Sequence, residues 1–70
     1  MMKPIKRFMK YLERELPEGY YAKCAPDGKE ITILNDDGYV YLFYKQEIEE
    51  DFELCCSLVT TVVDLTKKGA

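Results

Sequence analysis

Histidine is absent from this 70-residue chain, and cysteine is scarce in a way that limits its uses. Without histidine, a cysteine or serine nucleophile lacks its usual activating base, and no Gly-x-Ser-x-Gly segment is present. No Cys-x-x-Cys pair offers zinc ligands, and adjacent cysteines bridge each other only with strain. We therefore expect a protein that is not an enzyme and that uses no cofactor or metal. Its cysteines, Cys24, Cys55 and Cys56, are expected to serve as small buried apolar residues.

The sequence also lacks a long apolar run and a glycine-rich loop. No stretch is long enough to span a bilayer, and the basic N-terminus leads into a charged helical pattern rather than a signal-peptide core. The four glycines are isolated, which excludes a phosphate loop and a dinucleotide fingerprint. We expect one small domain over residues 1–70, in the cytoplasm and without a membrane contact.

What the chain does contain is a helical pattern, three strand patterns and a second helical pattern. Apolar residues recur at helical spacing before Pro17-Glu18-Gly19, which stops the first helix. Two turn signals, Pro26-Asp27-Gly28 and Asn35-Asp36-Asp37-Gly38, separate the strand patterns and make them antiparallel neighbours. The fold class is therefore α+β, an α-β-β-β-α meander with both helices packed on one face. The predicted elements are a helix over residues 3–16, strands over 20–25, 29–34 and 39–45, and a helix over 46–67.

The third predicted strand is apolar on both of its faces. Strand side chains alternate between faces, so Val40 and Leu42, with Tyr44 on the same face, are expected beneath the helices and the other set on an open face. A slip of one residue would exchange the two sets. Tyrosine is enriched at interface hot spots, although strand aromatics also stabilise cross-strand pairs. The predicted protein-binding face consists of Tyr21, Tyr39, Tyr41 and Phe43.

Acidic residues gather in the second turn and at the start of the last predicted helix. They either stabilise the turn and the helix dipole or bind a basic partner. The last helix also has a second apolar stripe, broader than one small sheet needs, which offers a homodimer interface. The acidic candidates are Asp36, Asp37, Glu47, Glu49, Glu50, Asp51 and Glu53, and the dimer candidates are Leu54, Leu58 and Leu65.

A basic stripe along the first predicted helix keeps nucleic-acid binding open as a third reading. The element order resembles that of the double-stranded-RNA-binding domain. That family carries lysines where this chain has the acidic start 46–51, and the loop Pro26-Asp27-Gly28 lacks its Gly-Pro-x-His pattern. Phosphates would be repelled there, so we expect no direct nucleic-acid contact by that route. The basic stripe consists of Lys3, Arg7, Lys10 and Arg14.

The turn 35–39 and the acidic cluster 47–53, in this element order, resemble the small acidic phage-encoded anti-CRISPR inhibitor proteins. Some of those proteins use carboxylates to occupy the nucleic-acid groove of a nuclease. The resemblance implies that the acidic candidates mimic phosphates and that the partner is a basic nucleic-acid-binding protein. The basic first helix departs from this pattern. The sequence thus predicts a non-catalytic protein-interaction module, in its sharpest form an inhibitor of a host CRISPR nuclease or defence complex, with a structural homodimer or a nucleic-acid binder as alternatives.

Overall fold

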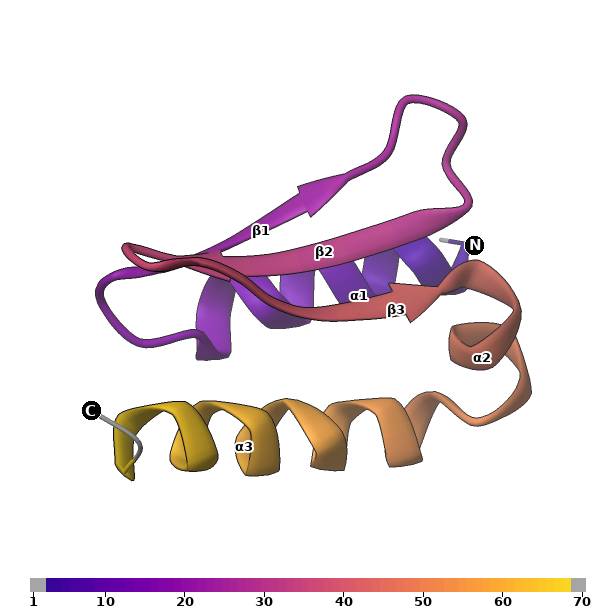
Figure 1. The fold of residues 1–70 in the computed structure, drawn as a ribbon. Coiled ribbons are helices and arrows are strands. Elements are labelled where there is room, and N and C mark those ends of the chain that lie inside the picture. The colour runs from indigo at the N-terminus through magenta and orange to yellow at the C-terminus, as the bar shows by residue number, and fades with distance from the viewer. Residues whose placement is uncertain (1–2, 69–70) are drawn as a thin grey trace.

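Within residues 3–68, which the computed structural model describes, three helices lie on one face of a three-stranded antiparallel sheet (Figure 1). The strand order β1-β2-β3 is that of a simple meander, so β3 is an edge strand as expected. The predicted α+β class is confirmed, but the predicted C-terminal helix is two helices. The elements are α1 (Pro4–Glu15), β1 (Tyr20–Cys24), β2 (Glu30–Asn35), β3 (Gly38–Tyr44), α2 (Lys45–Glu50) and α3 (Phe52–Lys68).

The break between α2 and α3 lies at Asp51, whose backbone leaves the helical region at φ −150° and ψ 81°. Its Oδ1 accepts a hydrogen bond from the Leu54 N–H at 3.1 Å, which makes Asp51 the N-cap of α3. The prediction of one helix over residues 46–67 is therefore wrong. Aspartate competes with the helix for backbone donors, and here the cap prevails over a continuous helical pattern.

The cap leads to a stability prediction. The variant Asp51→Ala should lower the free energy of unfolding by about 1 kcal/mol, because the first turn of α3 loses its side-chain acceptor. Urea unfolding followed by circular dichroism measures the change. The control Asp64→Ala removes the same exposed charge from the interior of α3, where alanine is the better helix former. An equal loss in both variants would contradict the capping role.

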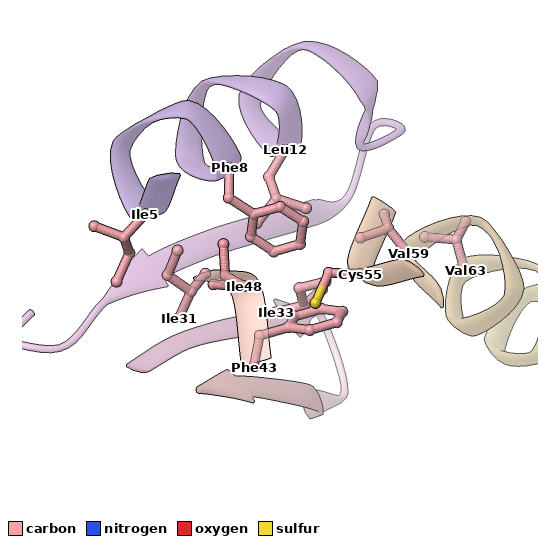
Figure 2. Close-up of a cluster of buried hydrophobic side chains, with 10 residues drawn as sticks. All are labelled: Ile5, Phe8, Leu12, Ile31, Ile33, Phe43, Ile48, Cys55, Val59 and Val63. Atoms are coloured by element: carbon pink, nitrogen blue, oxygen red, sulfur yellow. The ribbon is translucent and has the colours of Figure 1, made fainter. Parts of the chain in front are cut away.

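The core lies between the sheet and the three helices, with Phe8 near its centre (Figure 2). The Phe8 ring meets Phe43 edge to face at a centroid distance of 4.9 Å and Phe52 at 5.8 Å. Such aromatic pairs add to the stabilisation from burial alone. In the described part of the chain, the buried apolar residues are Ile5, Phe8, Leu12, Ile31, Ile33, Phe43, Ile48, Cys55, Val59 and Val63.

A β-bulge interrupts the pairing of β2 with β3. Leu34 pairs with Tyr39 and Ile33 pairs with Tyr41, so Val40 has no residue opposite it. One extra residue in a strand shifts the alternation of side chains by one position beyond it. From Tyr41 onward, the two faces of β3 are therefore exchanged. The side chains that simple alternation places on the open face lie on the helical side, and the others lie on the open face.

The bulge corrects the predicted binding face. Phe43 is 1% exposed and Tyr41 is half-buried, and both pack in or against the core. Their assignment to the open face is wrong, as is the assignment of Leu42 to the helical side, since Leu42 pairs with Thr32 on the opposite face. Tyr39, which precedes the extra residue, lies on the open side as predicted.

Candidate functional site

The sheet face turned away from the helices carries exposed tyrosines among smaller apolar and polar side chains. No described helix lies over this face (Figure 1). Tyr21, Tyr39 and Tyr44 are 56%, 68% and 51% exposed. From the strand register, the residues on this face, which we call the open face, are Tyr21, Lys23, Glu30, Thr32, Leu34, Tyr39, Leu42 and Tyr44.

The register arranges the open face in rows across the three strands. Tyr21 of β1 and Tyr39 of β3 both pair with Leu34 of the central strand. Cβ atoms of directly opposed residues lie about 5 Å apart, so the two tyrosines flank the leucine as one continuous apolar row. The neighbouring row consists of Lys23, Thr32 and Leu42. The face therefore offers an aromatic row with polar groups beside it.

Three apolar members of the open face were not predicted. Tyr44 and Leu42 were expected on the helical side, and Leu34 was not singled out. The alternative of a one-residue slip in the third strand would have placed Leu42 and Tyr44 on the open face. The bulge produces the same exchange of faces. Tyr44 also lines a hollow of about 500 Å³ with Lys45, at the start of α2. The open face thus continues around the end of β3.

The acidic candidates lie in two places, at opposite ends of β3 (Figure 1). Asp36 and Asp37 are in the β2–β3 turn, whereas the other five acids lie on α2, at Asp51 and at the start of α3. The strand between them is roughly 20 Å long at 3.3 Å per residue. The structure therefore does not bring the acidic candidates together into one surface.

Local contacts account for most of the acids near α2. Glu47 Oε1 accepts a hydrogen bond from the Tyr44 N–H at 3.1 Å, and Asp51 caps α3. Glu50 accepts from Gln46, and Glu49 lies 4.0 Å from the Lys45 ammonium. These exposed contacts stabilise the strand-to-helix connection. These acids therefore have a local structural role, whether or not they also bind a partner.

Two of the three leucine candidates for a dimer interface are exposed to solvent. Leu54 is 55% exposed and Leu65 is 65% exposed, whereas Leu58 is half-buried and packs against the core. The two exposed leucines are eleven residues apart, about 16 Å along one side of α3. Dimerisation through them stays a prediction.

The cysteines differ in environment, and one departs from expectation. Cys55 is buried in the core and Cys56 is half-buried, but Cys24 is exposed near the end of β1. The expectation that all three are buried is therefore wrong for Cys24, because none of the three described helices covers that end of the strand (Figure 1). Burial raises the pKa of the Cys55 thiol, and the nearby Glu47 carboxylate adds to the shift.

Thiol labelling should follow these environments. In the folded protein, Cys24 should react first with iodoacetamide and Cys55 at least about ten-fold more slowly, because a buried thiol with a raised pKa has little accessible thiolate. Peptide mass spectrometry over a time course gives the rates, and labelling in denaturant provides the control for sequence effects. Equal rates for the two thiols in the folded protein would contradict the packing of α3.

The described residues hold no group of three or more Cys, Asp or Glu side chains placed to bind a metal ion. Over the same residues, no helix has both the length and the apolar character of a membrane span. A scan against protein-family models and searches of curated proteins and of solved structures find no match. The geometry of the open face is therefore what carries a functional conclusion.

Proposed function

We propose that this protein is a non-catalytic binding module whose open face docks a protein partner. The observation that carries the proposal is the exposure of Tyr21, Tyr39 and Tyr44, each more than half, on a face that no described helix covers. Tyrosine buries a large area at a low cost in side-chain entropy and forms hydrogen bonds at the rim of an interface. Leu34 and Leu42 supply apolar area between the rings.

The β3 edge adds a second means of association beside this face. Edge strands present unpaired backbone groups that must be covered, blunted or used. The residues nearest the edge, Tyr39 and Tyr44, are also the exposed tyrosines of β3. A partner that contacts these two rings would therefore also lie next to the unpaired backbone of this edge.

The test compares the immobilised protein with two double variants in capture of a partner from a cell lysate. Tyr21→Ser with Tyr39→Ser should weaken capture about 30-fold or more, since a tyrosine hot spot is worth about 2 kcal/mol. The control, Leu54→Ser with Leu65→Ser, removes exposed apolar area from α3 and should retain the partner. Equal capture by the tyrosine variant and the unmodified protein would overturn the proposal.

The inhibitor form of the proposal depends on the acids and is tested separately. Glu49→Lys, Glu50→Lys and Glu53→Lys together should abolish binding to a basic partner, while Asp51 is left in place because it caps α3. Affinity for such a partner should also fall as salt is raised. An affinity unchanged across the salt series would contradict phosphate mimicry and leave the open face as the binding surface.

A homodimer is the second candidate, and the exposure of Leu54 and Leu65 on one side of α3 favours it. Light scattering over a range of concentrations should then show a dimer that Leu54→Ser with Leu65→Ser returns to monomer. A protein that stays monomeric at every concentration would eliminate this candidate. A dimer that survives this variant but not the tyrosine variant would place the interface on the open face.

A further inference from the structure

The helical side of the molecule holds a hollow that gathers positive charge around aromatic rings. This hollow, which we call the basic hollow, has a volume of about 300 Å³ and lies between α1 and the start of α3. Its lining includes no carboxylate, whereas two other hollows of the described chain each include at least one. The lining residues are Arg7, Lys10, Tyr11, Arg14 and Phe52.

Aromatic rings position both arginines of the basic hollow. The Arg7 guanidinium carbon lies 4.6 Å from the centroid of the Phe52 ring, and that of Arg14 lies 5.9 Å from the centroid of Tyr11. Phe52 is itself held by its edge-to-face contact with the buried Phe8. A cation–π contact restrains a guanidinium without using its N–H donors on a carboxylate. Arg7 is thus oriented by the core while its hydrogen-bonding edge stays available.

The acids near the hollow neutralise it only in part. Within residues 3–67, Arg7 and Lys10 have no carboxylate within 4.0 Å, and Arg14 forms an exposed pair with its neighbour Glu15 at 3.1 Å. Exposed ion pairs of this kind contribute little free energy, so Glu15 holds Arg14 only weakly. Burial raises the pKa of the nearby Cys56 thiol, Arg7 opposes that shift and Glu53 adds to it. Arg7 of the hollow and Glu53, which follows Phe52 in the chain, both act on this thiol, so Glu53 is a carboxylate close to the hollow.

We propose that the basic hollow binds a small ligand through a phosphate or diphosphate group. The planar guanidinium matches the oxygens of a phosphate bidentately, and Lys10 adds a mobile positive charge. The volume is at the small end of ligand sites, which begin at about 300 Å³. The acids of α2 and a formal net charge of −3 disfavour a long polyanion over a small one. The proposal is independent of the open face.

Titration with inorganic pyrophosphate tests the proposal. Calorimetry measures the affinity, and the NMR chemical shifts of the α1 amides locate the binding. Arg7→Gln and Lys10→Gln should each weaken pyrophosphate binding about ten-fold, the usual effect of losing a charge-assisted hydrogen bond. Lys6→Gln is the matched control, because it removes an exposed base of the same helix outside the hollow. Glu53→Gln should tighten binding about three-fold by removing the nearby negative charge.

Three outcomes would overturn the proposal. The first is an absence of pyrophosphate binding up to about 10 mM, because a dissociation constant above that concentration is too weak for a specific site. The second is an equal loss of affinity in Lys6→Gln and Lys10→Gln, which would show only diffuse attraction to the helix. The third is a single-stranded oligonucleotide that binds far more tightly than pyrophosphate, which would place binding along the whole basic stripe. Among the described residues, the cation–π contacts involve Arg7 and Arg14 and not Lys10, so the Lys10 variant separates loss of binding from loss of folding.

Discussion

Replacing Phe8 with alanine is expected to lower the free energy of unfolding by about 3–5 kcal/mol, which is the range for a fully buried phenylalanine. Phe8 is 0% exposed and its ring packs against Phe43, Phe52 and Tyr11. A domain of this length has a total stability of about 4–10 kcal/mol. The variant should therefore be largely unfolded, or close to unfolding, at 37 °C. Thermal and urea unfolding followed by circular dichroism measure the loss.

The matched control for this variant is Tyr39→Ala, which removes an aromatic ring from the open face. Tyr39 is 68% exposed, so its loss should change the free energy of unfolding by no more than about 0.5–1 kcal/mol. A small effect of Phe8→Ala would mean that α1 does not pack on the sheet as the structure has it. A large effect of Tyr39→Ala would mean that the open face is covered in the folded protein.

The second large effect separates two adjacent residues of β3. Phe43→Lys should unfold the protein, because an unpaired ammonium in the core costs more than about 4 kcal/mol. Leu42→Lys should cost only about 1 kcal/mol, since a lysine on the open face can extend its charged end into solvent. Circular dichroism and urea unfolding of the two purified variants give the comparison.

This pair of variants tests the bulge at Val40 directly. Simple alternation from Tyr39 would put Leu42 beneath the helices and Phe43 outside, and would reverse the two outcomes. If Leu42→Lys unfolds the protein and Phe43→Lys does not, the register of β3 is the one expected from the sequence. The comparison needs no partner and no ligand.

Much of the fold follows from local signals in the sequence. Pro4 and Pro17 bracket α1, and the Asn35–Gly38 turn sets the β2–β3 hairpin at the expected place. These signals act over a few residues, so a sequence shows them. The break at Asp51 was not predicted. An aspartate among other acids suits the first turns of one long helix, where it complements the helix dipole, as well as it suits the N-cap of a new helix.

The candidate site was predicted less completely, for a physical reason. Tyr21 and Tyr39 precede the bulge and were placed correctly, whereas the residues of β3 after the bulge, 41–44, were expected on the wrong face. Whether a strand contains an extra residue depends on packing across the sheet, here on burying Phe43 against Phe8, and not on a local pattern. Longer-range contacts likewise create the basic hollow, which brings Phe52 to a stripe that the sequence showed only as charge.

The two proposed surfaces lie on different sides of the protein. The open face belongs to the side of the sheet turned away from the helices (Figure 1), whereas the lining of the basic hollow comes from α1 and the start of α3. A partner on the sheet would thus leave Arg7 and Lys10 accessible to a phosphate group. We therefore expect pyrophosphate to leave capture through the tyrosines unchanged.

Photo-crosslinking from position 39 tests most directly whether the open face binds a protein. Tyr39 is replaced by the photoreactive residue benzoylphenylalanine, and Thr61, exposed on α3, is replaced likewise as the control. Illumination in cells should give an adduct with a different protein from position 39 and none from position 61. A third variant carries benzoylphenylalanine in place of Glu49, on α2. An adduct with another protein from position 49, and none from position 39, would contradict the open-face account and place binding on the acidic helix instead.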